Sequence, residues 1–516
     1  MDLPIVVAAL LLPWMLGAAI VAALRDPARA PEAPGEFAWL AGTGWFVGAF
    51  VLTLWMRALA LAGLRFSIAA VALPLIALAL TLLVVAWRRG GRRLVAAKLA
   101  ALSALVRSPG LAGAARVAWW AAIAWLVLRF ALLALEVGWR PLYPWDAWIQ
   151  WATKARVWYE YGTLVPFARA GEWFAAGGKL FFDASPEYPP TVPLWQVWMS
   201  LALGRFDDAL MNAPWWMTAV MLTVASYGAV RRLGHPALTA LAAAALVATL
   251  PLANVHVALA GYADLPLAAY YTVGVLAFVH WATGSTAAGA EGTGRERDWR
   301  DAALALLLLL ACTQIKNPGL AWALTVVPGL AVALSPRHGL KLAAAGFVVA
   351  VVALALLAQT HPVVFHYRLH LDFEPDWGAL GQSYFLLGNW TLLWYGAILA
   401  LALGWRQLLS PALAAYTVTM AAGLLFLFVV FGFTNARAWV TDQTTVNRAT
   451  LHFAPLVAIW VVLVFSAFAA RWRDTHPARN AGAGAPAPAA ADPVATAVGG
   501  DAAAAPDIPA STPAAG

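Results

Sequence analysis

Residues 66–93 read FSIAAVALPLIALALTLLVVAWRRGGRR. A helix needs about 20 apolar residues to cross the hydrocarbon core of a bilayer, and residues 66–87 provide this length without a charged side chain. A basic segment follows at once, with Arg88, Arg89, Arg92, Arg93, Lys98 and Arg107. Because lysine and arginine accumulate in cytoplasmic loops, the stretch predicts a membrane-spanning helix that ends on the cytoplasmic side.

The composition of the whole chain agrees with this local pattern. Of its 516 residues, 63% are hydrophobic and 11% are charged, whereas about a quarter of an ordinary soluble domain is charged. Soluble enzymes, nucleic-acid-binding domains and secreted disulfide scaffolds are therefore excluded. The single cysteine, Cys312, permits no intrachain disulfide. We attribute the formal net charge of +8 to cytoplasmic loops in a lipid bilayer, and not to a nucleic-acid partner.

Apolar runs recur along the chain and predict an all-α, polytopic transmembrane protein. The alternating ten-residue segments of a membrane β-barrel are absent, so the spans are expected to be helical. We expect thirteen spans, near residues 3–24, 38–63, 66–87, 116–137, 212–230, 236–256, 265–283, 301–315, 318–334, 340–360, 384–404, 409–433 and 451–470. Within one of them, Arg129 and Glu136 are seven positions apart and are expected to form a structural pair.

Alternation from the basic segment predicts which loops share a side of the membrane. Loop 138–211 falls outside, and the stretch 189–204 within it is interpreted as an interfacial or re-entrant helix, because a further span would invert every later loop. Residues 474–516 are rich in alanine, glycine and proline and predict a disordered cytoplasmic tail. The later basic residues then fall inside: Arg231, Arg232, Arg295, Arg297, Arg300, Arg337, Lys341, Arg406, Arg471 and Arg473.

The large external loop carries the first candidate functional residue. Asp146 stands where a helix is expected to begin, and Trp148, Trp151 and Trp158 recur on one face of that helix. This pattern favours an amphipathic helix on the outer membrane surface. An aspartate in such a position is often a helix N-cap only.

Other charged residues emerge on the same predicted face. Glu187 lies in SPEYPP (185–190), Asp264 in GYADLP (261–266) and Lys316 in TQIKNPG (313–319), while Arg448 precedes the last span. A charge so close to hydrocarbon is costly unless it is paired or lines a polar cavity, so these positions are functional candidates. A salt-bridge network without catalytic function is the simpler alternative.

The order of these elements resembles the GT-C glycosyltransferases. An aspartate in the first large external loop, a Tyr-Pro-Pro element, an aspartate after two more spans and a Lys-Asn pair at a short hairpin are similar to the bacterial RgtA/B/C/D-like, family 39-like branch, which includes protein mannosyltransferases and aminoarabinose transferases. The resemblance covers about residues 116–335 and weakly reaches Arg448. The acidic pair that this family often has in its first loop is here Asp146 followed by Ala147.

The resemblance also implies a division of the chain. Residues 111–335 would form a GT-C-like catalytic transmembrane core with external loop 138–211. Residues 1–110 would add N-terminal helices and the basic cytoplasmic loop, and residues 336–473 would add C-terminal helices with external loop 361–383. The tail 474–516 would follow.

The activity implied is transfer of a sugar from a polyprenyl-phosphate donor to a hydroxyl of a glycan, lipid or protein acceptor, at the periplasmic face of the bacterial inner membrane. Asp146 suits the general base that takes the acceptor proton, and a single displacement inverts the anomeric carbon. Lys316 and Arg448 suit the leaving phosphate. Asp264 and Glu187 are further catalytic candidates that could position the acceptor, bind the sugar or hold a divalent cation. Candidate substrate-binding residues are Tyr188, Asn317 and Tyr262.

Two alternatives remain open from the sequence. A divalent cation is possible, although no ligand set is assigned, and the His366/His370 pair lacks a third ligand at a telling distance. A transporter or flippase of lipid-linked oligosaccharide or polysaccharide also needs many spans. It predicts polar residues through the middle of several helices, whereas the charges of this chain gather at one surface.

Overall fold

The computed structural model describes residues 2–25, 33–91, 110–284, 297–364 and 367–476. The chain divides into a unit of residues 1–469 and a second unit of residues 470–516. The predictions for Arg92, Arg93, Lys98, Arg107, Arg295 and His366 lie outside the described residues, as does the predicted tail beyond residue 476.

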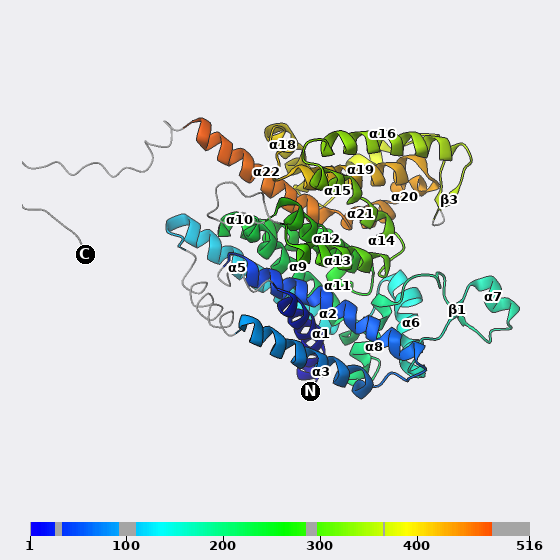
Figure 1. The fold of residues 1–516 in the computed structure, drawn as a ribbon. Coiled ribbons are helices and arrows are strands. Elements are labelled where there is room, and N and C mark those ends of the chain that lie inside the picture. The colour runs from blue at the N-terminus through cyan, green and yellow to red at the C-terminus, as the bar shows by residue number, and fades with distance from the viewer. Residues whose placement is uncertain (1, 26–32, 92–109, 285–296, 365–366, 477–516) are drawn as a thin grey trace, which may run out of the picture. The chain divides into compact units, whose positions relative to one another are not determined.

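The described chain is helical, with apolar helices long enough to cross a membrane, so it is an all-α, multi-pass membrane protein (Figure 1). Eight helices within the described residues pass by length and composition: α1 (Asp2–Leu24), α2 (Glu36–Leu61), α3 (Ile68–Ala86), α5 (Gly113–Trp139), α12 (Asp264–Thr283), α16 (Gly339–Ala358), α19 (Ala414–Phe433) and α22 (Ala454–Thr475). Helices α10 (Ala237–Ala248) and α11 (Pro251–Ala258) form a pair bent by 57°, which would make a ninth span.

Each of the thirteen predicted runs contains a helix. In four of the runs, the helices within the described residues are not both long enough and apolar enough to count as membrane spans. These four runs contain α9 (Ala213–Arg232), α13 (Trp299–Thr313), α14 (Gly319–Leu324) with α15 (Val327–Leu334), and α18 (Leu393–Gly404). The other elements are short: η1 (Trp87–Gly91), η2 (Ala147–Trp151), α6 (Ala152–Tyr161), β1 (Phe167–Ala168), α7 (Ala170–Ala175), β2 (Phe181–Phe182), α8 (Thr191–Leu203), η3 (Leu210–Asn212), β3 (Val363–Val364), β4 (Tyr367–Arg368), α17 (Trp377–Gly381), η4 (Gln382–Leu386), η5 (Asn435–Arg437), α20 (Ala438–Thr441) and α21 (Thr444–Leu451).

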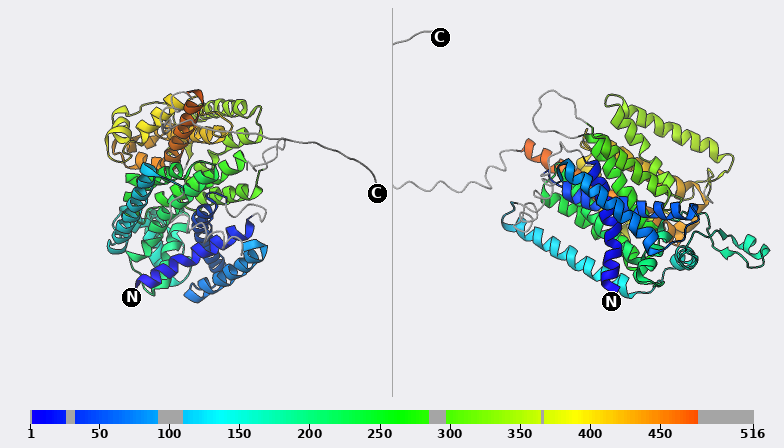
Figure 2. Two further views of the ribbon diagram at one scale, coloured as in Figure 1. Left: turned by 90° about the vertical axis from the view of Figure 1, so that its left-hand side faces the viewer. Right: turned by 60° about the horizontal axis from the view of Figure 1, so that its bottom comes forward.

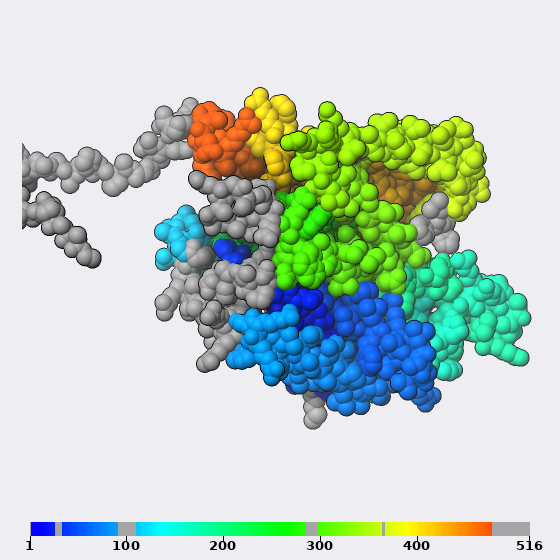
Figure 3. Space-filling model, in the orientation of Figure 1, coloured from blue at the N-terminus to red at the C-terminus, as the bar shows by residue number. Residues whose placement is uncertain are grey.

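Helix α12 forms the core of the first unit. Every residue from Asp264 to His280 is buried, and α12 packs against α9 and α13. Two of its tyrosines bond to neighbouring helices, because Tyr270 donates to the carbonyl oxygen of Phe46 and the Tyr271 hydroxyl lies 2.5 Å from that of Thr325. The N-terminal helices α1 to α3 and the C-terminal helices α16 to α19 lie on opposite sides of this central layer (Figures 1 and 3).

Glycines allow the N-terminal helices to approach closely. The sequence Gly44–Gly48 is a GxxxG motif on α2, and a Cβ at Gly48 would overlap the carbonyl oxygen of Pro13 on α1. Small residues at such spacing bring the backbones of membrane helices together. In contrast, α3, α5 and α16 are mostly unburied although strongly apolar, as expected of helices that face lipid.

The loop 138–211 is folded against the helices. Helix α8 is 13 residues long, is almost entirely buried and packs against α1, α2 and α6, in agreement with a helix sealed by protein. Beyond α6, the segment with β1, α7 and β2 projects away from the helices, as the right view of Figure 2 also shows (Figures 1 and 2). The predicted pair of Arg129 and Glu136 is wrong, because Arg129 donates to Asn254 and Glu136 pairs with Arg140.

Candidate functional site

Asp264, the first residue of α12, is the centre of a buried polar cluster. Its Oδ1 accepts hydrogen bonds from Lys316 Nζ at 2.6 Å and from His452 Nε2 at 2.9 Å. Its Oδ2 accepts from Arg448 Nη2 at 2.9 Å and Nε at 3.1 Å. A carboxylate has about four lone-pair positions, and all of them are occupied here. Asp264 is therefore suited to hold its partners in place, and it has no free position for a substrate proton.

Arg448 also forms an ion pair with a second carboxylate, that of Asp146. Its Nη1 lies 2.7 Å from Oδ2 of Asp146, and its guanidinium lies 4.5 Å from the ring centroid of Tyr262. The fold thus brings together Asp146, Asp264, Lys316 and Arg448, four of the residues selected from the sequence, and adds His452. We call these five residues the Asp264 cluster.

The backbone around Asp146 explains how its carboxylate reaches Arg448. Residues 147–151 form a π-helical turn, and the Asp146 side chain makes no capping hydrogen bond to it. Ala147 is buried against Gly261, whose φ of 114° lies in the region that favours glycine. A Cβ at Gly261 would stand 2.6 Å from that of Ala147. Asp146 stands at the N-cap position, as predicted, but its side chain pairs with Arg448 and does not cap the turn.

His452 is the member of the cluster that sequence reasoning missed. It is 2% exposed, and its Nδ1 accepts a hydrogen bond from Trp322 Nε1 at 3.1 Å. Because an indole nitrogen can only donate, Nδ1 carries no proton and Nε2 donates to Asp264. The signal was present in the sequence, because His452 follows Arg448 by four positions, the spacing that places two side chains on one helical face.

The electrostatics keep positive charge in the cluster. Burial works against the charge of Arg448, but the carboxylates of Asp264 and Asp146 outweigh it and raise the pKa of Arg448 above its ordinary value. Burial lowers the pKa of Lys316, and the Asp264 carboxylate opposes this effect. Arg448 is thus a permanent cation shared by two carboxylates.

A cavity of about 770 Å³ opens from the Asp264 cluster. All five cluster residues line it, with Gln150, Tyr188 and Tyr367 beside them. The rest of its wall is largely apolar and comes from α14, α16 and α19, with residues such as Trp322, Phe347, Leu354, Leu357, Leu425 and Phe426. A charged end and a long apolar wall suit an amphiphilic ligand with a polar head and a hydrocarbon chain.

The other predicted residues are placed differently. Tyr188 lines the cavity, whereas Glu187, Asn317 and Tyr262 are not among the lining residues. Tyr262 instead packs its ring against the Arg448 guanidinium. Glu187 Oε2 lies 3.2 Å from Arg169 Nη2 in the projecting segment. The structure therefore does not bring Glu187 or Asn317 to the cavity wall.

The predicted indole face lies only partly on the surface. Trp148 is 46% exposed, whereas Trp151 and Trp158 are 1% and 5% exposed and are packed inside the protein. Lys154 of α6 is also buried and holds the loop that precedes Tyr188, because it donates to the carbonyl oxygen of Ser185 and lies 3.6 Å from Asp183. Burial lowers the pKa of Lys154 and raises that of Asp183.

The residues of the cluster do not fit a divalent cation. Such an ion needs several free oxygen ligands, but the Asp264 oxygens are filled and Asp146 is paired with Arg448. Within the described part of the chain, no group of three or more His, Cys, Asp or Glu side chains is arranged to hold a metal ion.

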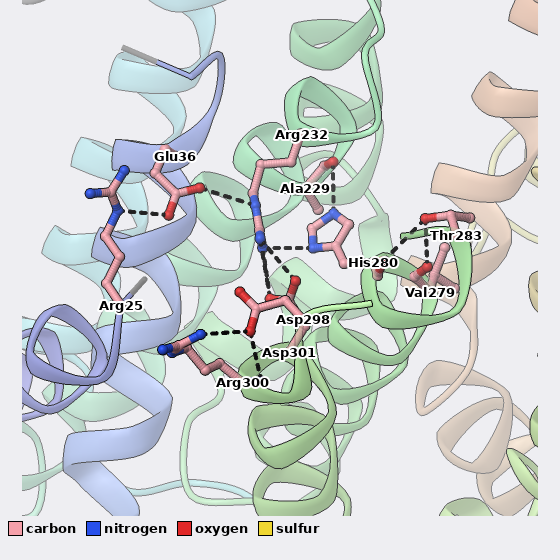
Figure 4. Close-up of polar contacts among 10 residues, drawn as sticks. All are labelled: Arg25, Glu36, Ala229, Arg232, Val279, His280, Thr283, Asp298, Arg300 and Asp301. Carbon is pink, nitrogen blue, oxygen red and sulfur yellow. Dashed lines mark hydrogen bonds and ion pairs between the residues drawn. The ribbon is translucent and has the colours of Figure 1, made fainter. Parts of the chain in front are cut away.

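A second buried ion cluster lies at the other end of α12 (Figure 4). Arg232 binds both oxygens of Asp301 at 3.0 to 3.2 Å, lies 3.2 Å from Glu36 Oε2 and donates to His280 Nδ1 at 2.8 Å. It joins α2, α9, α12 and α13, and its side chain is 6% exposed. We interpret this Arg232 cluster as structural, because its residues join four helices and none of them lines the cavity of the Asp264 cluster.

Comparison with known proteins returns no family model, no curated protein and no solved structure that matches this chain.

Proposed function

We propose that this protein is an integral membrane glycosyltransferase of GT-C type that transfers a sugar from a polyprenyl-phosphate donor to an acceptor hydroxyl at the periplasmic face of a bacterial inner membrane. One observation carries the proposal: a single cavity joins the Asp264 cluster to a long apolar wall. A polyprenyl-phosphate sugar has the same division into a polar head and a hydrocarbon chain. The proposal includes thirteen membrane spans and a relationship to the family 39-like branch.

The cations of the cluster suit the donor phosphate. The leaving polyprenyl phosphate is an anion, so it needs fixed positive charge more than a proton. Arg448 uses Nε and Nη2 on Asp264, so a two-pronged phosphate contact is not open to it while that pair is intact. Lys316 makes one hydrogen bond to Asp264 and has two further N–H donors, so we assign it the closer phosphate contact.

Asp146 is the residue suited to act as the base. In this scheme its carboxylate takes the proton of the acceptor hydroxyl while the hydroxyl oxygen attacks the anomeric carbon. The bond between that carbon and the phosphate oxygen breaks in the same step, and its electron pair leaves with the phosphate. A single displacement of this kind inverts the anomeric centre. Asp264 is the positioning residue, because its oxygens are already filled.

Release of polyprenyl phosphate tests the proposal. The purified protein in lipid would receive a mixed pool of polyprenyl-phosphate sugars and a membrane extract as acceptor source. We expect release by the native protein and a loss of about 10²- to 10⁴-fold in the Asp146→Asn variant, the usual contribution of a general base. Asp208→Asn, at an exposed aspartate outside the cavity wall, is the matched control and is expected to keep native activity.

The alternative is a transporter or flippase of lipid-linked glycans. It predicts movement of labelled lipid-linked sugar across vesicles that contain the protein, without bond transfer. Release at the native rate by Asp146→Asn would refute Asp146 as the base. Movement without release would replace the transferase by the transporter.

A further inference from the structure

Gln150 has an unusual position in the cavity wall. It is 7% exposed, and its Nε2 is buried without a hydrogen-bond partner among the described residues. Of the residues that line the cavity, it is the only one within the described chain whose buried side-chain nitrogen or oxygen lacks a partner. Buried polar groups are nearly always hydrogen-bonded, so an amide without a partner on a residue of the cavity wall favours a ligand that reaches this side chain when it binds.

The backbone holds this amide in a defined place. Gln150 lies in the π-helical turn 147–151, between Ala147, which is pressed against Gly261, and Trp151, which is 1% exposed. Insertions of this kind in helices are frequent at functional sites. Asp146 precedes the same turn and lines the same cavity, so Gln150 and the proposed base belong to one part of the cavity wall.

The chemistry of an amide selects the kind of ligand atom. A glutamine side chain both donates and accepts hydrogen bonds, as does a hydroxyl group, whereas a phosphate only accepts and is served by Lys316 and Arg448. Tyr188, which also lines the cavity, packs against Trp151 with 5.1 Å between ring centroids. An aromatic face beside an amide suits a sugar ring, which presents C–H faces and hydroxyl edges.

We propose that Gln150 hydrogen-bonds a hydroxyl group of the sugar carried by the donor lipid, and so determines which sugar is accepted. This inference rests on the function proposed above. It assigns Gln150 to the sugar, Lys316 to the phosphate and the apolar wall to the polyprenyl chain.

Binding of two lipids tests this assignment. The probes are polyprenyl phosphate without a sugar and a panel of polyprenyl-phosphate hexoses, each titrated against the purified protein in lipid nanodiscs. We expect the Kd of the best-bound hexose lipid to rise about tenfold in Gln150→Ala, while the Kd of sugar-free polyprenyl phosphate changes less than about twofold. Ser200→Ala is the matched control, since the Ser200 hydroxyl is also buried without a partner among the described residues but does not line the cavity.

The outcomes separate the inference from the proposed function. Equal effects of Gln150→Ala on both lipids, or no effect on the hexose lipid, would overturn the role of Gln150 while the proposed function stands. A native protein that binds no hexose lipid more tightly than polyprenyl phosphate would also overturn that role. Binding of neither lipid by the native protein would overturn the proposed function and this inference with it. Unchanged binding of sugar-free lipid shows that the variant is folded.

Discussion

Nε2 of His452 lies 2.9 Å from Oδ1 of Asp264, across 188 positions of sequence. The other ring nitrogen of His452 accepts a hydrogen bond from Trp322. The histidine therefore links a buried indole to the Asp264 carboxylate at the start of α12. Asp264 in turn holds Lys316 and Arg448. The geometry of Lys316 and Arg448 therefore depends on His452, which makes no direct contact with either cation in these hydrogen bonds.

Replacing His452 by leucine is expected to destabilise the protein by about 1–3 kcal/mol, because it leaves a buried carboxylate oxygen and a buried indole N–H each short of one partner. His452→Gln keeps a donor near the position of Nε2 and is expected to retain most of the stability. Thermal unfolding in detergent measures both variants. Equal losses for leucine and glutamine would assign the effect to the shape of the ring and not to its hydrogen bonds.

The same histidine predicts a dependence of stability on pH. Burial lowers the pKa of His452 below its ordinary value; Asp264 opposes this, and Lys316 and Arg448 reinforce it. The unfolded chain therefore takes up the proton more readily, so the stability contribution is complete above about pH 6.5 and is lost as the pH falls below that value. Between about pH 7.5 and about pH 5.5, the melting temperature of the native protein should fall more steeply than that of His452→Gln. Parallel curves would contradict a neutral His452.

The turn that carries Asp146 depends on the missing side chain of Gly261. Gly261→Ala places a Cβ 2.6 Å from that of Ala147 and forces alanine into a φ of 114°, so we expect the turn to shift and the release of polyprenyl phosphate to fall about a hundredfold. Gly90→Ala is the control, because its φ of 101° is similarly unfavourable for alanine and nothing lies within 4 Å of the added Cβ. The pair Ala147→Gly with Gly261→Ala should recover part of the activity, since it removes one of the two clashing carbons. No recovery would assign the loss to backbone strain alone.

The sequence predicts those residues of the site that follow from a helical spacing or from the side of the membrane on which a loop lies. The positive-inside rule grouped Asp146, Asp264, Lys316 and Arg448 on one face, and the structure brings their side chains within ion-pair distance. His452 could have been added from its spacing of four after Arg448. The burial of Lys154 could not have been predicted, because its partner Asp183 lies in a loop whose path no sequence periodicity specifies.

Helix periodicity misled the interpretation of residues 146–158. The 3- and 7-residue spacing of Trp148, Trp151 and Trp158 assumes 3.6 residues per turn, whereas residues 147–151 form a wider π-helical turn. Amphipathicity also does not distinguish a face that meets lipid from one that meets protein, and Trp151 and Trp158 meet protein. The unpaired amide of Gln150 depends on this turn and is not visible in the sequence.

Arg448→Lys tests the bridge between the two carboxylates. A lysine is a single point charge and cannot occupy Asp146 and both positions on Asp264 at once. We expect the rate of polyprenyl phosphate release to fall about a hundredfold because Asp146 loses its orientation. Arg437→Lys is the control at an arginine of η5 that pairs with Glu374 outside the cavity wall. Equal activity of the two variants would mean that charge alone is required at position 448.

The Arg232 cluster provides a test of the difference between a structural and a functional ion network. Sixteen positions along α12 separate Asp264 from His280, a distance of about 24 Å in a helix. Arg232→Met removes the cation that Glu36 and Asp301 share, and loss of one member of a buried ion network costs about 3–5 kcal/mol. We therefore expect a large fall in melting temperature, while the folded fraction binds polyprenyl phosphate with the native Kd because distant sites act independently. Asp301→Asn in the Arg232→Met background should restore part of the stability, since it removes the negative charge that Arg232 balanced in the native protein. A change in Kd without a change in melting temperature would show instead that the Arg232 cluster communicates with the cavity along α12.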